Sequence, residues 1–167
     1  MLNLMGWHLH GELPNRGKFI IAVAPHSSNI DFLLTMWVIM SLGLQCSFLA
    51  KASLFRLPLG WIMRFFGGIP VDRSSRHGVV EQMTERFRQS SQLVLGIAPE
   101  GTRGAVDRWR SGFAQIAQAA NIPVQPAIID YARKCVTFAT LIEDVGDVQN
   151  TVLAMQSAAR QGSPRRG

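Results

Sequence analysis

Cysteine is scarce in this chain of 167 residues: Cys46 and Cys135 are the only two, and they lie far apart. Disulfide-stabilised scaffolds and Cys-rich zinc sites need several cysteines at close spacing, so both classes are excluded. Two isolated cysteines are typical of a reducing compartment. We therefore expect a cytoplasmic protein.

Several well-known catalytic motifs are also absent. The chain contains no Gly-x-Ser-x-Gly, no Gly-x4-Gly-Lys-Ser/Thr, no His-Glu-x-x-His and no Gly-x-Gly-x-x-Gly. Their absence argues against serine hydrolases, P-loop proteins, zinc proteases and Rossmann enzymes. Ser27 and Ser28 lie beside a histidine but outside any nucleophile elbow, and capping a helix is the better role for both. Without a covalent nucleophile, a histidine must activate the substrate's own hydroxyl.

The N-terminus lacks the features of a signal peptide. It reaches polar residues by Asn3 and has no long apolar centre, so we expect the mature chain to start near Met1. The strongest candidate for a membrane span is 32–50, which is broken by Gly43. A buried helix up to Leu42 followed by a core strand fits this break better than a span does.

The charge balance is positive, with a net charge of +6. Such an excess suggests an anionic partner, either nucleic acid, anionic lipid or a phosphorylated metabolite. We expect no nucleic acid, because the chain has no helical run of Lys and Arg and no Cys/His finger spacing. With 47% hydrophobic residues, the length suits one domain, which we expect over 1–160, with a basic flexible tail at 161–167.

Strand-like and helix-like segments alternate along the chain. Continuously apolar runs predict strands that are buried on both faces, and shorter runs predict further strands. We expect strands within 6–13, 18–24, 45–49, 67–73, 93–98, 124–129 and 135–140, and helices over 30–42, 78–90, 109–120 and 148–159. This alternation predicts an α/β fold, a single-domain sandwich with a largely parallel central sheet flanked by helices.

Residues 53–66 leave two interpretations open. The segment is rich in apolar and aromatic side chains, contains Arg56 and Arg64, and is interrupted by Pro58 and Gly60. It could be a helical segment that contributes to the core. It could equally be an aromatic, basic surface in a membrane interface, where Trp anchors the protein and Arg meets lipid headgroups.

A histidine and an aspartate five residues apart, His26 and Asp31, make a possible base and its orienting carboxylate. In a regular helix these positions would lie about 140° apart, since each residue turns by about 100°. They can converge only if the backbone changes conformation between them. Pro25 favours an extended residue before it, while Asn29 and the two serines ahead of it are good helix caps. We therefore expect His26 on a strand-to-helix turn and Asp31 in the first turn of the helix.

Polar clusters follow three of the expected strands. They are 26–31, Arg73 with Arg76, and 100–103. Successive parallel strands end on the same side of a sheet, so the three clusters should gather at one rim. Together they offer a titratable histidine, a carboxylate to hold its tautomer, and arginines suited to bidentate phosphate binding. This rim is the predicted active site.

Four motifs in order carry a resemblance to a known family. They are His26-x4-Asp31, Gly68-Ile69-Pro70-Val71-Asp72-Arg73, Pro99-Glu100-Gly101-Thr102-Arg103 and Ile122-Pro123-Val124-x-Pro126. In order and approximate spacing they resemble the motifs of the glycerolipid acyltransferases, typified by 1-acylglycerol-3-phosphate acyltransferase. The matching stretch lies within residues 18–130.

The resemblance implies transfer of a fatty acyl group to the hydroxyl of a lysophospholipid or glycerol-phosphate-type acceptor, lysophosphatidic acid first among them. The donor would be acyl-CoA or acyl-carrier protein, with no cofactor and no metal. Carried over by position, His26 would be the general base, and Asp31 would orient and stabilise its imidazolium.

The resemblance also assigns the binding residues. The acceptor phosphate would be bound in a pocket formed by Arg73, Glu100, Gly101, Thr102 and Arg103. Glu100 cannot itself attract phosphate, so it would hold an arginine or a hydroxyl. The acyl donor or its pocket would involve Asn29, Lys51 and Pro126.

Membrane contact would rest on the surface formed by 54–66 and on basic residues, which implies peripheral attachment to the inner face of the membrane. Many members carry a hydrophobic helical pair ahead of the His-x4-Asp motif, and about 25 residues precede the motif here. Two rival functions use the same residues. One is a lipid- or phosphate-binding module without turnover, and the other is hydrolysis of a thioester or ester by water at His26.

Overall fold

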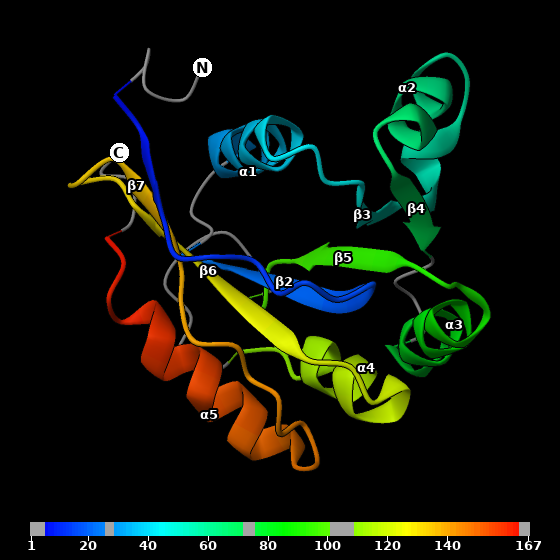
Figure 1. Cartoon of the computed structure of the whole chain (residues 1–167). Helices are drawn as coiled ribbons and strands as arrows, with labels where there is room; N and C mark the ends of the chain where they lie inside the picture. Colours follow the sequence, from blue (N-terminus) through cyan, green and yellow to red (C-terminus); the bar gives the residue numbers. More distant parts are fainter. Residues whose placement is uncertain (1–5, 26–28, 72–75, 101–108, 164–167) are drawn as a thin grey trace.

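A seven-stranded sheet flanked by helices on both faces forms the centre of the protein (Figure 1). A computed structural model of the chain describes residues 6–25, 29–71, 76–100 and 109–163. The strands are β1 (His8–His10), β2 (Lys18–Ala24), β3 (Cys46–Lys51), β4 (Gly68–Val71), β5 (Leu93–Ile97), β6 (Val124–Asp130) and β7 (Cys135–Phe138). The helices are α1 (Asn29–Ser41), the 3-10 helix η2 (Ala52–Phe55), α2 (Leu59–Phe65), α3 (Arg76–Gln89), α4 (Gly112–Ala120) and α5 (Val148–Ala159).

The sheet is largely parallel, as the sequence predicts. Its strand order is β1-β7-β6-β2-β5-β3-β4. The five strands from β6 to β4 run in one direction, while β7 pairs antiparallel with β6, and β1 runs parallel to β7 at the edge. The expected α/β fold is thereby confirmed, with one antiparallel edge that the alternation pattern does not predict.

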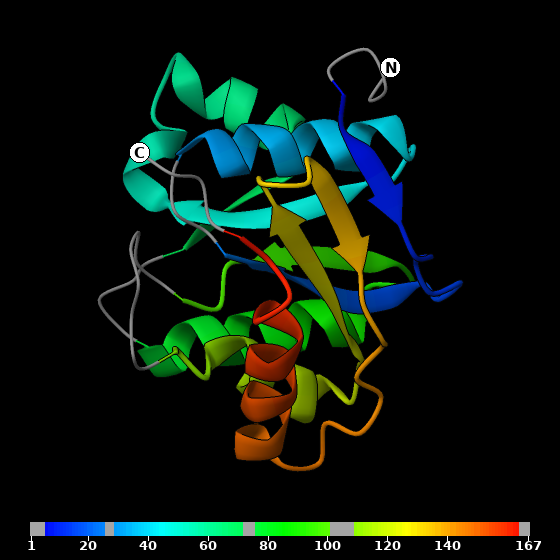
Figure 2. The ribbon, with the colours of Figure 1, turned by 90° about the vertical axis from the view of Figure 1, so that its left-hand side faces the viewer.

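Helices cover the two faces of the sheet unequally. Helix α1 lies on one face, and α3, α4 and α5 cover the other (Figures 1 and 2). Side chains of β2 alternate between the two cores: Ile20 packs with the three-helix side, and Phe19 and Ile21 pack with the α1 side. All three are at most 1% exposed, which explains why the strand is continuously apolar.

The segment that resembles a membrane span is a helix followed by a core strand. Helix α1 ends at Ser41, and Gly43 adopts a left-handed conformation with φ of 67°. The N–H of Leu44 donates to the carbonyl of Ile39 at 3.2 Å, which is a Schellman-type C-cap that glycine favours. Strand β3 then begins at Cys46. Among the described residues, no helix combines the length and apolarity that crossing a membrane requires.

Beyond α5 the chain returns to the end of β6. The N–H of Tyr131 donates to the carbonyl of Ser163 at 3.1 Å. A Cβ on Gly162 would meet Ile128 Cγ2 at 2.7 Å, so glycine permits this close approach. The division into a domain over 1–160 and a tail stays a prediction, since 164–167 lie outside the described residues.

Candidate active site

The rim predicted to hold the site is formed by the carboxyl ends of parallel strands. The three polar clusters follow β2, β4 and β5, which run in one direction. Strands β2 and β5 are neighbours, whereas β4 is three places from β2. At about 4.8 Å per strand, β4 lies about 14 Å from β2. The sheet therefore brings the first and third clusters to adjacent strands and the second to its edge.

Part of the predicted site lies outside the described residues, which exclude 26–28, 72–75 and 101–108. The roles of His26, Arg73, Gly101, Thr102 and Arg103 therefore stay predictions. Arg76 begins α3.

Asp31 lies in the first turn of α1, as the sequence predicts. It is fully buried, and the hydroxyl of Tyr131 donates a hydrogen bond to its Oδ1. The N-terminal end of a helix favours a negative charge, because the helix dipole and the first backbone N–H groups point there. One turn later, the hydroxyl of Thr35 donates to the carbonyl of Asp31 at 2.7 Å. The carboxylate is thus held by a partner from another element, at a helix end that favours its charge.

Tyr131 is the residue that sequence reasoning missed. It directly follows β6, the strand on the other side of β2 from β5, so it joins the same rim. The indole of Trp7 packs edge-on against its ring, with centroids 5.2 Å apart and planes at 88°. Its signal in the sequence is its position, since it stands at the carboxyl end of an apolar strand, as the three predicted clusters do.

Glu100 follows β5 and is buried, with 9% of its surface exposed. Beside it, the carbonyl of Pro99 accepts a hydrogen bond from the N–H of Arg110 at 2.9 Å. This bond joins the described residues on either side of 101–108, and these residues therefore lie close together at the rim.

The residues predicted for the acyl-donor side are spread over the sheet. Asn29 is the first residue of α1, and Lys51 is exposed at the carboxyl end of β3, so both lie at the rim. Pro126 is buried inside β6, opposite Ala22 of β2. It is four residues from the end of its strand, or about 13 Å at 3.3 Å per residue. The structure does not bring Pro126 to the rim, and a role in packing fits its position.

Cys46 cannot serve as an acyl carrier. Burial raises the pKa of its thiol to about 12, and a hydrogen bond with the backbone of Gly96 offsets only part of this effect. Nucleophilic attack requires the thiolate, so Cys46 remains an unreactive thiol at neutral pH.

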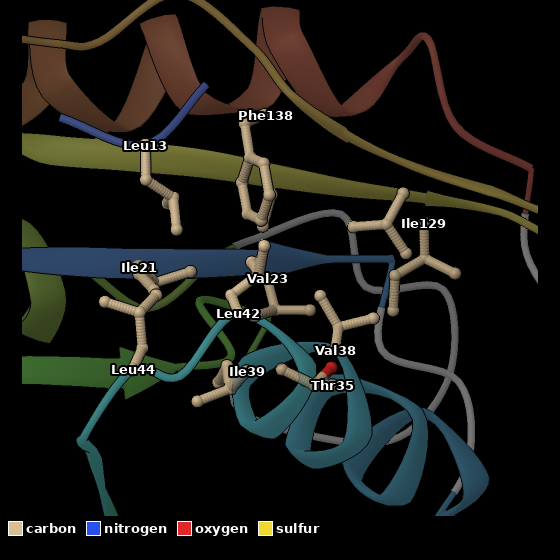
Figure 3. A pocket seen from close by; sticks show the side chains of 12 residues that line it. Leu13, Ile21, Val23, Thr35, Val38, Ile39, Leu42, Leu44, Ile129 and Phe138 are labelled. Atoms are coloured by element: carbon tan, nitrogen blue, oxygen red, sulfur yellow. The ribbon is translucent and has the colours of Figure 1, made fainter. Parts of the chain in front are cut away.

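A small apolar pocket lies between α1 and the sheet (Figure 3). Its free volume is about 10 Å³, which is near the lower limit for a single water molecule. The lining side chains include Ile21, Val23, Val38, Ile39, Ile129 and Phe138. A fatty acyl chain finds no room in this pocket.

Comparisons with known proteins point to one family. The Acyltransferase family model matches residues 7–130. The chain is 27% identical over 122 residues to the 1-acyl-sn-glycerol-3-phosphate acyltransferase BAT2, chloroplastic, of Brassica napus, covering 69% of this chain and 34% of that protein. It is 26% identical over 122 residues to the corresponding enzyme LPAT1, chloroplastic, of Arabidopsis thaliana, covering 69% and 33%.

A solved structure shares the fold. The 1-acyl-sn-glycerophosphate acyltransferase PlsC of Thermotoga maritima superposes with a TM-score of 0.62 at 15% identity, covering 98% of this chain and 76% of that one. The chain spans about a third of the length of the two curated plant relatives. The family match covers most of the chain and includes all four motifs. The resemblance noted in the sequence is confirmed, and the chain belongs to the acyltransferase family.

Proposed function

We propose that this protein transfers a fatty acyl group from acyl-CoA or acyl-carrier protein to the hydroxyl of a lysophospholipid, with lysophosphatidic acid as the first candidate. The observation that carries the proposal is Asp31, buried at the N-terminal end of α1 within a matched acyltransferase region. The plant relatives are named as 1-acyl-sn-glycerol-3-phosphate acyltransferases, which supports this acceptor.

In the proposed mechanism, His26 removes the proton from the acceptor hydroxyl. The hydroxyl oxygen then attacks the thioester carbonyl, and a new C–O bond forms. As the tetrahedral intermediate collapses, the C–S bond breaks and the thiolate takes the proton from the imidazolium. Asp31 holds the imidazole and stabilises its positive charge. An ionised carboxylate can accept about four hydrogen bonds, so its bond with Tyr131 is compatible with a bond from a histidine.

Binding of the two substrates is divided along the rim. Arg73, Gly101, Thr102 and Arg103 would hold the acceptor phosphate through guanidinium, hydroxyl and backbone N–H donors. Glu100 would fix one of these donors. Asn29 and Lys51 lie at the rim and would face the acyl donor. The reaction would take place at the inner face of a membrane, because the acceptor is a lipid.

A product analysis tests the proposal. The purified chain is incubated with lysophosphatidic acid and acyl-CoA or acyl-carrier protein, while released thiol and lipid products are measured by mass spectrometry. One phosphatidic acid per thiol is expected. Free fatty acid with released thiol would instead identify a hydrolase, and lipid binding without thiol release would identify a binding module.

Tyr131→Phe is expected to lower kcat about tenfold, with little change in KM for either substrate. The substitution keeps the ring against Trp7 but removes the hydroxyl that holds Asp31. A hydrogen bond to a charged group contributes about 1.5–3 kcal/mol, and part of this is expected in the transition state. Steady-state kinetics measure the effect. Thr84→Val serves as the control, since it removes another buried hydroxyl, which donates to Val80 on α3.

A second measurement tests the hydrogen bond without using activity. Tyr131 is the only tyrosine, so labelling with 3-fluorotyrosine gives one ¹⁹F resonance. Asp31→Asn should shift this resonance, because the charged acceptor of the hydroxyl is lost. An unchanged resonance in the folded variant would show that Tyr131 does not depend on Asp31.

A further inference from the structure

Helix α2 lies beside the β4 edge of the sheet (Figure 1). Together with η2 it carries an exposed apolar surface. Its side chains are 42–88% exposed, although their hydrophobicity would suit a core. They are Leu54, Leu57, Leu59, Trp61, Ile62 and Phe65, and we call them the η2–α2 surface. Of the two sequence interpretations, the packing favours the outward-facing one.

The large side chains of α2 face outward because of the way this helix packs on η2. Gly60 is buried against the backbone of Phe55, and a Cβ there would meet the Phe55 carbonyl oxygen at 2.0 Å. The inner side of α2 is therefore a glycine, which leaves the large side chains to point outward. Trp61 and Phe65 stack one turn apart on the outer side, with ring centroids 6.4 Å apart.

The charged residues of the segment that forms this surface are basic. Lys51, Arg56 and Arg64 are exposed, and the sequence has no Asp or Glu anywhere from 32 to 71. The guanidinium carbon of Arg64 lies 5.6 Å from the ring centroid of Phe55, so this cation is held beside the apolar side chains. A basic, aromatic surface complements an anionic bilayer, whose headgroups are negative and whose interior is apolar.

The η2–α2 surface also starts at the rim that holds the candidate active site. Helix η2 follows Lys51, the last residue of β3, and the carboxyl ends of β3 and β5 point the same way. A bilayer on this surface would lie beside the end of the rim formed by β3.

We propose that the η2–α2 surface docks on an anionic lipid bilayer, with Trp61 and Phe65 in the interface and Arg56 and Arg64 at the lipid phosphates. The inference rests on the proposed function, because in that function the acceptor is a lysophospholipid that comes from a bilayer. It adds which part of this chain meets the lipid and which lipid charge it prefers.

Binding to vesicles tests the inference without any substrate. Co-sedimentation compares phosphatidylcholine vesicles with vesicles that contain phosphatidylcholine and phosphatidylglycerol in equal parts. The wild-type protein should bind the anionic vesicles at least about tenfold more tightly, and salt should weaken this preference. Equal binding to both kinds of vesicle, or binding to neither, would overturn the proposal.

Two sets of variants locate the contact. Trp61→Ser with Phe65→Ser should weaken binding to anionic vesicles at least about tenfold by removing apolar area. Arg56→Gln with Arg64→Gln should remove most of the preference for anionic lipid, about 30-fold for two arginines. Leu153→Ser is the matched control, since Leu153 is 60% exposed on α5, away from α2. Full vesicle binding by the Trp61/Phe65 variant would contradict the assignment.

The alternative partner of the η2–α2 surface is a second copy of the chain. If the surface is a dimer interface, sedimentation velocity without lipid would show a dimer that Phe65→Ser dissociates, and vesicle binding would not change.

Catalysis is measured separately, on a short-chain lysophosphatidic acid below its micelle concentration. The Trp61/Phe65 variant should keep its rate on this soluble acceptor. A failure of the proposed function would then appear in wild-type turnover, and a failure of this inference in wild-type vesicle binding.

Discussion

His26→Ala is expected to reduce thiol release from an acyl thioester, in the presence of lysophosphatidic acid, by a factor of about 100–10,000. General base catalysis contributes a factor of this size, because an unassisted hydroxyl at neutral pH is a poor nucleophile. The measurement is the initial rate of thiol release, followed with a thiol reagent. Cys46 and Cys135 are both buried, and the Cys46 thiol has a pKa of about 12, so the protein's own thiols should add little background.

His10→Ala is the matched control for this variant. His10 lies on β1, at the edge of the sheet farthest from β4, and is exposed. It should keep the full rate. Both variants should unfold at the wild-type temperature, which separates a catalytic effect from a loss of structure. A His26→Ala protein that remains folded and turns over at the wild-type rate would rule out the His-Asp mechanism.

The local features of the site could be predicted because short-range rules govern them. The sequence from Pro25 to Asn29 predicts a helix start, and α1 does begin at Asn29, with Asp31 in its first turn. The partner of Asp31 could not be found in this way. Tyr131 is 100 residues further along the chain, and it reaches Asp31 only because β6 pairs with β2. Strand order depends on long-range packing, which no local pattern encodes.

The prediction of one rim does not give the distances between the polar clusters along it, because those distances depend on strand order. Parallel strands do end on the same side, which justifies expecting one rim. The sequence does not reveal that β5 and β3 lie between β2 and β4. Arg73 follows the edge strand β4, whereas Glu100 follows a strand next to β2. The acceptor site must therefore bridge several strands if the predicted arginines act together.

Whether the apolar side chains of a helix face the core or the outside is equally hard to predict from sequence. Buried helices and interfacial helices both contain large apolar residues, and the pattern in 53–66 suits either. The structure shows that the aromatic residues of α2 face outward, because Gly60 has no side chain and lets α2 pack closely on Phe55. Phe65 on α2 is accordingly 77% exposed, whereas Phe87, a core residue on α3, is 1% exposed.

Phe87→Ala is expected to lower the free energy of unfolding by about 3–5 kcal/mol, which is a large part of the stability of a domain this size. Phe87 lies on α3 and packs in the core with Ile69 and Val71 of β4 and Leu95 of β5. Removing its ring leaves a cavity that close-packed neighbours fill only in part. Urea unfolding followed by Trp fluorescence measures the change.

Phe65→Ala deletes the same atoms from an exposed site, so it should change the free energy of unfolding by no more than about 0.5 kcal/mol. The same variant should weaken binding to anionic vesicles, while Phe87→Ala, under conditions where it stays folded, should bind them as the wild type does. The two phenylalanines thus separate stability from lipid contact. If Phe65→Ala lost several kcal/mol of stability, its ring would be packing within the protein, and α2 could not present the aromatic surface that the docking proposal requires.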